Sequence, residues 1–183
     1  MTRQGRGSQL SSARILLLTG APGIGKTTLV LKVSEALGDR RLGGFTTGEI
    51  REGGRRRGFR ILPFTGPERV MAHVDFRGPA RVGRYGVDLA ALDAAAEPAL
   101  ALDPAVDVYI VDEVGKMECL SERFVAAMRG VLDSDKRVIA TVAQAGGGFM
   151  AEVKRRRDVE LWAVTQNNRD ALPERILAWL RQG

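Results

Sequence analysis

The sequence predicts an α/β fold of three layers, in which helices cover both faces of a mainly parallel β-sheet. Two observations lead to this prediction. Short apolar runs typical of buried parallel strands alternate with segments whose apolar residues recur at helical spacing. A Gly-rich turn at residues 20–27 directly follows the first apolar run and opens a helix, which is the arrangement of a phosphate-binding loop. A β-hairpin-rich insert over about residues 44–87 interrupts the alternation.

The first half of the chain divides into a core strand, a core helix and the insert. Residues 14–19 are apolar, as in a buried strand. Apolar residues at helical spacing predict a helix over 27–37, which Gly38 ends. The insert carries one strong turn signal, Glu52-Gly53-Gly54-Arg55, and predicts a hairpin and two further strands over residues 45–51, 56–64, 70–76 and 81–87.

The second half continues the core alternation. Asp88 can cap an Ala- and Leu-rich helix that Pro98 interrupts or restarts. Apolar runs predict three more core strands, over residues 106–111, 136–142 and 159–164. Helices are expected over residues 121–132, 149–157 and 170–181, the last with Pro173 in its first turn.

Length and composition are those of one domain. The chain has 183 residues, of which 44% are hydrophobic and 27% charged. We expect residues 1–13 to form a flexible tail and residues 14–183 to form a single domain. No apolar run approaches the roughly 20 residues of a membrane span, so no membrane partner is expected. The single cysteine, Cys119, cannot form an internal disulfide, which suits a cytoplasmic protein.

The net charge of +6 leaves nucleic acid possible as a partner without favouring it. The arginines are scattered, and aromatic residues, which would stack on single-stranded bases, make up only 5% of the chain. A zinc site is not expected, because His73 is the only histidine and has no cysteine cluster to join. The sequence leaves the oligomeric state open.

The strongest motif is a P-loop, G-x-x-x-x-G-K-[ST]. Its glycines let backbone N–H groups point at phosphate oxygens, and the helix that follows adds its positive end. Lys26 is expected to reach the β- and γ-phosphates, and Thr27 to offer its hydroxyl to Mg²⁺. The predicted nucleotide-binding residues here are Gly20, Ala21, Pro22, Gly23, Ile24, Gly25, Lys26, Thr27 and Thr28.

The second motif is an apolar strand that ends in two acids, Asp112 and Glu113. Asp112 is expected to serve the Mg²⁺ shell, as in a Walker B strand, and both acids to face the nucleotide. Glu113 is expected to orient the attacking water, the alternative being a solvated loop acid. If both acids face the nucleotide, the chain must leave strand geometry at Glu113, because adjacent strand residues point to opposite faces.

The acids are followed by Gly115 and Lys116, also expected to bind nucleotide. Gly115 permits a sharp turn. Lys116 can place a positive charge near the γ-phosphate and neutralise charge that develops during transfer. The alternative for Lys116 is a surface lysine. The predicted catalytic residues are thus Lys26, Glu113 and Lys116.

These motifs occur in one order with three further runs: Gly44 to Arg51 with Gly58-Phe59, Val82 to Val87, and Val164-Thr165 with Asn168-Arg169-Asp170. The chain thereby resembles the small P-loop nucleoside-triphosphatases, known as thermostable or cancer-related nucleoside-triphosphatases, over about residues 14–181. Its most specific part is the stretch from Asp112 to Glu118. The resemblance implies a P-loop nucleoside-triphosphatase fold related to RecA-type ATPases and nucleotide kinases. It also implies Mg²⁺-dependent hydrolysis of nucleoside triphosphates, including ATP and GTP, to diphosphates with broad base tolerance.

Two weaker features lie outside these motifs. Asn167-Asn168-Arg169-Asp170 departs from the guanine-reading N-K-x-D motif at Asn168, so Arg169 is expected to flank the base and Asp170 can instead cap the last helix. The basic runs 55–57 and 154–157 are typical of solvated faces, and the alternative is a lid over the phosphates.

Two other functions stay open. One is a nucleotide or nucleoside kinase on the same fold, which would need an acceptor pocket and usually a mobile arginine lid. The other is a switch or nucleic-acid-linked ATPase, which the scattered charge and few aromatics disfavour.

Overall fold

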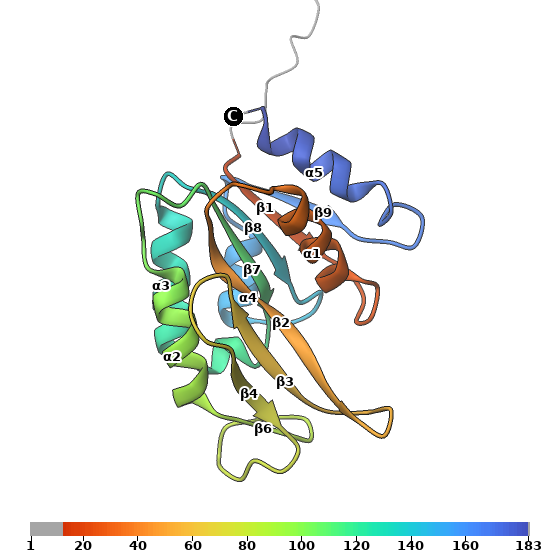
Figure 1. Ribbon diagram of the computed structural model, residues 1–183, viewed down its shortest axis with the longest axis vertical. Coiled ribbons are helices and arrows are strands. Elements are labelled where there is room, and N and C mark those ends of the chain that lie inside the picture. The colour runs from red at the N-terminus through yellow and green to blue at the C-terminus, as the bar shows by residue number, and fades with distance from the viewer. Residues whose placement is uncertain (1–12, 183) are drawn as a thin grey trace, which may run out of the picture.

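The computed structural model describes residues 13–182 and contains one nine-stranded mixed sheet between two layers of helices (Figure 1). The expected three-layer α/β fold is confirmed. Half of the sheet is a parallel core, in which each strand pairs in parallel with its neighbours. In spatial order these strands are β2 (Leu42–Glu52), β7 (Val108–Val114), β8 (Arg137–Val142), β1 (Ile15–Thr19) and β9 (Val159–Ala163).

The insert extends this sheet as an antiparallel half. From the core outwards it consists of β3 (Arg55–Pro63), β4 (Arg69–His73), β6 (Tyr85–Val87) and β5 (Arg81–Val82). Strand β2 belongs to both halves, because its first residues pair with β7 and the rest pair with β3. The hairpin predicted at Glu52–Arg55 is confirmed. The single strand predicted over 81–87 is wrong, because Gly83 has φ 57° and the segment turns there into two short strands.

Helices cover the two faces of the sheet separately (Figure 1). One face carries α1 (Lys26–Ala36) and α5 (Leu172–Leu180). The other carries α2 (Leu89–Leu100), α3 (Glu122–Asp133) and α4 (Gly148–Lys154). The strands serve both layers by alternation. In β1, for example, Ile15 and Leu17 pack under α2 and α3, whereas Leu16 and Leu18 pack under α1 and α5.

Among the described helices, α2 and α3 begin with a side-chain cap, whereas α1, α4 and α5 do not. The Asp88 carboxylate accepts the backbone N–H of Ala91 at 2.9 Å and caps α2, as expected. Pro98 lies inside α2 without ending it, because the helix continues to Leu100. The cap expected of Asp170 is wrong: α5 begins after Ala171, with no side-chain cap.

Strand ends differ from expectation in two places. The predicted core strand at 159–164 is β9, an edge strand whose Leu161 side chain stays 45% exposed. Strand β7 runs further than predicted, through both acids to Val114. The tail expected over residues 1–13 lies outside the described residues except for Ala13, which is buried and accepts a hydrogen bond from Arg137. Within residues 13–182, no helix combines the length and apolarity needed to cross a membrane.

Candidate active site

The P-loop joins β1 to α1 at the carboxyl end of the parallel core, and two of its glycines adopt backbone angles that other residues rarely reach. Gly23 has φ 76° and Gly25, immediately before α1, has φ 106°. Gly20 is needed for a different reason, because a β-carbon there would lie 2.6 Å from the Val164 carbonyl oxygen. The motif therefore lies between a strand and a helix, as predicted. Thr27 is half-buried in the first turn of α1, and Ala21, Pro22 and Thr28 are exposed.

Lys26 connects the P-loop to the acid motif. Its ammonium donates a hydrogen bond to the Gly20 carbonyl oxygen at 3.2 Å and lies 3.7 Å from the Glu113 carboxylate. The Lys26 side chain is only 10% exposed, so this cation is confined to the space between the loop and the end of β7. A phosphate group held by the loop would meet Lys26 and Glu113 together.

Asp112 is buried and fixed by two threonine hydroxyls. Thr141 of β8 donates to one carboxylate oxygen at 2.7 Å, and Thr47 of β2 donates to the other at 3.2 Å. The strands on either side of β7 therefore orient this acid, and sequence reasoning missed both threonines. A polar residue within the apolar run of β8 was the available signal for Thr141.

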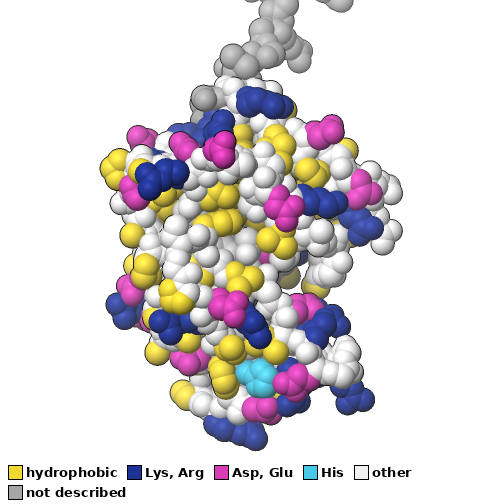
Figure 2. Space-filling view, in the orientation of Figure 1, with side chains coloured by type: hydrophobic (Ala, Val, Ile, Leu, Met, Phe, Trp, Pro, Cys, Tyr) yellow, Lys and Arg dark blue, Asp and Glu magenta, His cyan; other side chains and the backbone are white. Residues whose placement is uncertain are grey.

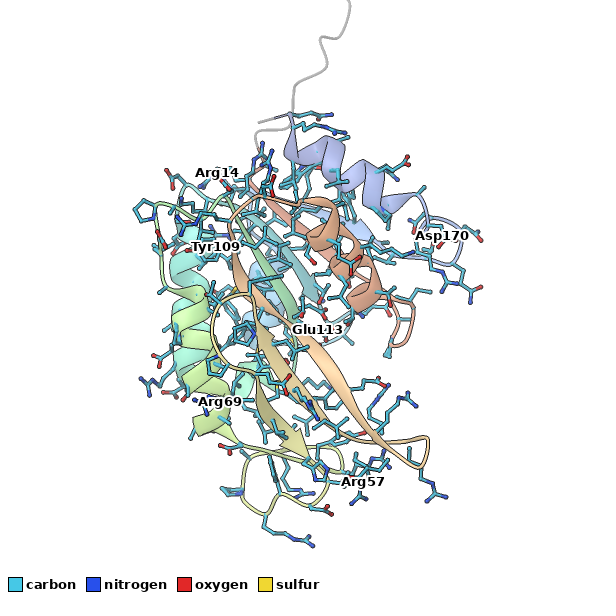
Figure 3. All side chains as sticks on the ribbon, viewed as in Figure 1. Arg14, Arg57, Arg69, Tyr109, Glu113 and Asp170 are labelled. Atoms are coloured by element: carbon cyan, nitrogen blue, oxygen red, sulfur yellow. The ribbon has the colours of Figure 1, made fainter. Side chains whose placement is uncertain are left out.

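Glu113 follows Asp112 at a point where the pairing of β7 with β8 is interrupted. The register shifts between Val111 and Val114, so the two acids leave regular strand pairing as expected, although β7 resumes at Val114. Figure 3 shows Glu113 at the end of β7 nearest α1. Burial raises the pKa of Glu113 and the Asp112 charge raises it further, while the nearby Lys26 cation opposes both. A carboxyl with a raised pKa is better matched to proton transfer near neutral pH.

The turn after β7 also brings the carboxylate of Glu118 close to that of Glu113, and the sequence analysis assigned Glu118 no role. A β-carbon on Gly115 would lie 2.8 Å from a Glu113 oxygen and 2.9 Å from a Glu118 oxygen, so a larger residue there would displace one of these carboxylates. Glu118 is buried and begins the short 3-10 helix η1 (Glu118–Leu120). Burial is the main cause that raises the pKa of Glu118 to about 8, with smaller contributions from the charges of Glu113 and Asp112.

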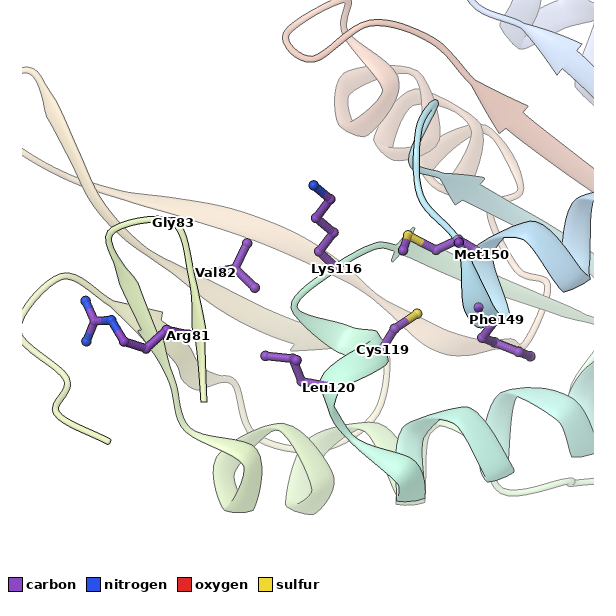
Figure 4. Close-up of a pocket in the computed structure, with 10 residues that line it drawn as sticks. Arg81, Val82, Gly83, Lys116, Cys119, Leu120, Phe149 and Met150 are labelled. Carbon is purple, nitrogen blue, oxygen red and sulfur yellow. The ribbon is translucent and has the colours of Figure 1, made fainter. Parts of the chain in front are cut away.

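Lys116 is exposed on this turn and has no hydrogen-bond or ion-pair partner among the described residues. It lines a cleft rather than packing against the surface. In Figure 4 its side chain extends away from Cys119 and Leu120, so its ammonium is free to meet an anion.

The turn between β9 and α5 reaches the P-loop through Arg169. Its guanidinium donates to the Ile24 carbonyl oxygen at 3.3 Å and remains 45% exposed. Asn168 instead holds the turn itself, because its side chain bonds the backbone of Thr165 and Ala163, both at 2.8 Å. The amide group of Asn168 is thus engaged by backbone hydrogen bonds. The Asp170 side chain points away from the sheet in Figure 3.

Each basic run contains arginines held in ion pairs, whereas Arg55, Arg155 and Arg157 form none among the described residues. Arg56 pairs with Glu49, and Arg57 with Glu52 and Asp75. Arg156 is held by Asp133 and Asp158 at 2.7 and 2.9 Å, and the lid over the phosphates stays a prediction. Figure 2 shows basic and acidic side chains side by side over the lower part of the molecule, where the antiparallel strands lie.

The donor chemistry at the loop fits Mg²⁺. Asp112 offers carboxylate oxygens and Thr27 a hydroxyl, and hard oxygen donors are what Mg²⁺ prefers. No group of three or more His, Cys, Asp or Glu side chains within residues 13–182 could hold a metal ion by itself.

Comparison with known proteins identifies relatives over nearly the whole chain. The sequence model of a family described as NTPase matches residues 15–177. Nucleoside-triphosphatase THEP1 of Thermotoga maritima is 41% identical over 167 residues, which cover 91% of this chain and 95% of that protein. The human cancer-related nucleoside-triphosphatase is 38% identical and covers 87% of this chain, with 93% of its own length matched. The crystal structure of THEP1 from Aquifex aeolicus superposes with a TM-score of 0.82 at 35% identity, covering 91% of this chain and 98% of that chain.

Proposed function

This chain belongs to the nucleoside-triphosphatase family of THEP1 and the cancer-related nucleoside-triphosphatase, and on that premise we propose that it hydrolyses nucleoside triphosphates to diphosphate and phosphate with Mg²⁺ and little preference for the base. The resemblance expected from the motifs is confirmed, and the chain is a nucleoside-triphosphatase by family. The observation that carries the proposal is the 3.7 Å approach of Lys26 to Glu113 beside the P-loop.

The P-loop supplies the phosphate site. Its backbone N–H groups and the start of α1 attract the phosphate chain, and Lys26 contacts the β- and γ-phosphate oxygens. Because the Lys26 ammonium also faces Glu113, the γ-phosphorus would lie within one water molecule of the Glu113 carboxylate.

Glu113 activates the attacking water. Its carboxylate accepts a proton as the water oxygen attacks the γ-phosphorus, and the nucleoside diphosphate leaves with the bridging oxygen. Asp112 cannot take this role as readily, because Thr47 and Thr141 already bind its two oxygens and hold them in place. The two adjacent acids therefore have different roles: Asp112 binds the metal, and Glu113 activates the water.

Thr27 and Asp112 are the residues that would hold Mg²⁺ at this site, where the ion would supply positive charge against the phosphates. Lys116 adds a second positive charge from the turn after β7. Its freedom from protein partners supports a role in stabilising charge that develops on the transferring phosphoryl group.

Tolerance of different bases follows from the hydrogen bonds of the side chains in the β9–α5 turn. Asn168 is occupied by backbone hydrogen bonds, which leaves the exposed Arg169 as the residue placed to flank the base. A guanidinium can lie against any base without reading its edge. We expect ATP and GTP to be hydrolysed with efficiencies that differ by less than about a hundredfold.

Glu113→Gln tests the proposal, because glutamine keeps the size of the side chain and loses the base. The turnover of ATP and GTP with Mg²⁺ should fall by roughly 10²–10⁴, while affinity for a non-hydrolysable ATP analogue is kept. Glu174→Gln, on the exposed side of α5, is the matched control and should behave as the parent. Normal hydrolysis by the Glu113 variant would remove this residue from the mechanism.

A further inference from the structure

A cleft of about 600 Å³ opens beside the acid motif, and only one of its lining residues, Lys116, has a role in the reaction above. It lies between the β5–β6 hairpin, the turn that carries Lys116 with η1, and the start of α4 (Figure 4). Neither the P-loop nor Glu113 lines it, so it is separate from the site expected for the triphosphate. Its volume falls within the roughly 300–1,000 Å³ typical of sites for small organic molecules.

Three glycines keep the cleft open. Gly83, Gly147 and Gly148 belong to its lining, and a β-carbon added to any of them would meet no atom within 4 Å. The space in front of these glycines is therefore not filled by other side chains of the described residues. Gly147 has extended backbone angles, φ −98° and ψ −158°, so a larger residue fits there without backbone strain.

The side chains around this space offer apolar surface. Leu120 is 39% exposed, and Val82 and Cys119 are half-buried, so each keeps surface that the protein does not cover. In Figure 4, Val82 and Met150 lie on either side of Lys116, with Cys119 and Leu120 below it. Because a methionine sulfur makes favourable contacts with aromatic rings, these walls suit an aromatic molecule.

The cleft also carries one positive charge that the protein leaves free. Arg81 lines it, but its guanidinium donates to two backbone carbonyl oxygens and points away from the centre in Figure 4. Lys116 is then the one cation of the lining with no protein partner among the described residues. It follows Gly115, against which the Glu113 carboxylate lies, so a second negative charge on a ligand would be repelled by that acid. A ligand with one negative charge therefore complements the cleft best.

We propose that this cleft binds an aromatic molecule with a single negative charge, and that the bound molecule inhibits nucleoside-triphosphate hydrolysis by holding Lys116. The anionic group of the ligand accepts hydrogen bonds from the Lys116 ammonium, and its ring lies against Val82 and Leu120. The inhibition rests on the proposed function, because it needs Lys116 to stabilise charge on the transferring phosphoryl group. The binding does not, because no P-loop residue lines the cleft.

The binding test compares two fluorescent probes that differ only in charge. Anilinonaphthalene sulfonate carries one sulfonate on an aromatic body, and phenylnaphthylamine is the same body without the sulfonate. Each is titrated into the protein with and without a saturating non-hydrolysable ATP analogue and Mg²⁺. We expect the sulfonate to bind about tenfold more tightly than the neutral probe in both conditions, and Lys116→Ala to abolish that difference. Lys32→Ala, exposed on α1, should keep it.

Two substitutions that fill the cleft locate the probe. Leu120→Trp fills it from η1 and Gly147→Trp from the residue before α4, and each should weaken binding of the sulfonate at least about tenfold. Leu161→Trp is the matched control, because Leu161 is similarly exposed, at 45%, but lies on the edge strand β9. Its affinity for the sulfonate should equal that of the parent.

Hydrolysis of ATP with Mg²⁺ measures the inhibition. Saturating the parent with anilinonaphthalene sulfonate should lower kcat at least about tenfold and change KM for ATP less than about threefold, because Lys116 acts on the transition state and the P-loop stays free. Leu120→Trp should keep its own kcat when the probe is added, and Leu161→Trp should be inhibited as the parent is.

Equal affinities for the two probes, or an unchanged affinity in both tryptophan variants of the cleft, would overturn the inference. Displacement of the sulfonate by the ATP analogue would do the same, because it would place the probe in the nucleotide site. Binding in the cleft without a fall in kcat would overturn the inhibition. A parent protein that releases no phosphate without any probe would instead contradict the proposed function, and the titrations would still decide whether the cleft binds the anion.

Discussion

The two halves of the sheet are built on different principles. In the parallel core both faces are covered, so successive residues of β7 from Val108 to Val111 are all fully buried and divide between the two helical layers. In the antiparallel half only one face is covered, mainly by α2, which packs against Ile61, Met71 and Ala72. The opposite face is exposed and carries Arg60, which alternates with Ile61 along β3 and forms an ion pair with Glu68.

Coverage of both faces of the sheet explains why the candidate active site lies in the parallel half. A site on strands covered on both faces is held in place by packing from above and below. Asp112 illustrates this, because it is buried at the end of β7 and receives hydroxyl groups from the strands on either side. The insert contributes Thr47, through β2, and one wall of the cleft, and four of its arginines form surface ion pairs: Arg51, Arg56, Arg57 and Arg60.

Lys26→Ala should have the largest effect of any single change. It removes the cation that joins the P-loop to Glu113 in the parallel core, so affinity for a triphosphate should fall by at least about a hundredfold. Calorimetric titration with a non-hydrolysable ATP analogue measures this. Lys32→Ala, exposed on the same helix, is the control and should bind as the parent does. An affinity for the Lys26 variant within threefold of the parent would exclude the P-loop as the triphosphate site.

Ile110→Ala measures how strongly the covered half is packed. Ile110 is fully buried on β7 beneath α1 and α5, and its truncation leaves a cavity that these elements cannot readily close. We expect the free energy of unfolding to fall by about 2–5 kcal/mol. Urea unfolding followed by circular dichroism gives the value. A loss below about 1 kcal/mol would mean that the core adapts far more freely than its burial indicates.

Glu118 should make the stability of the core depend on pH. Its pKa is raised from 4.5 to about 8 by burial, so the folded protein keeps a proton that the unfolded chain releases between these values. The free energy of unfolding should therefore fall as the pH rises from about 5 to 8, by on the order of 1 kcal/mol per pH unit. Glu118→Gln mimics the protonated acid and should lack this decline.

Urea unfolding of the parent and of Glu118→Gln at several pH values between 5 and 8 measures the difference. Glu174→Gln, whose carboxylate is exposed, should follow the parent curve. If the parent and the Glu118 variant gave parallel curves, Glu118 would be ionised in the folded protein.

Arg60→Ala should have the smallest effect, because it lies on the exposed face of the insert. Its ion pair with Glu68 at 2.9 Å joins two side chains that are 46% and 55% exposed. Such pairs contribute about 0–1 kcal/mol, less at high salt. The same urea measurement should show a loss in that range. A loss similar to that of Ile110→Ala would erase the distinction between the two halves.

Sequence patterns were sufficient for the parts of the site that depend on local chemistry. The P-loop needs glycines at positive φ followed by a lysine at the start of a helix, and these requirements are visible in the order of residues 20–27. The same holds for the Asp112–Glu113 pair at the end of an apolar run and for the Asp88 cap. Boundaries that depend on neighbours were less accurate, as the turn at Gly83 and the uncapped start of α5 show.

The sequence by itself determined the alternation of strands and helices, the hairpin and the phosphate-binding chemistry, because each depends on residues close together in the chain. Only the tertiary structure decided which side chains meet across strands. Thr47 and Thr141 lie 65 and 29 residues from Asp112, and no local pattern brings them to it. Burial likewise comes from the whole fold, so the raised pKa of Glu118 and the cleft beside Lys116 depend on how the insert, η1 and α4 pack together.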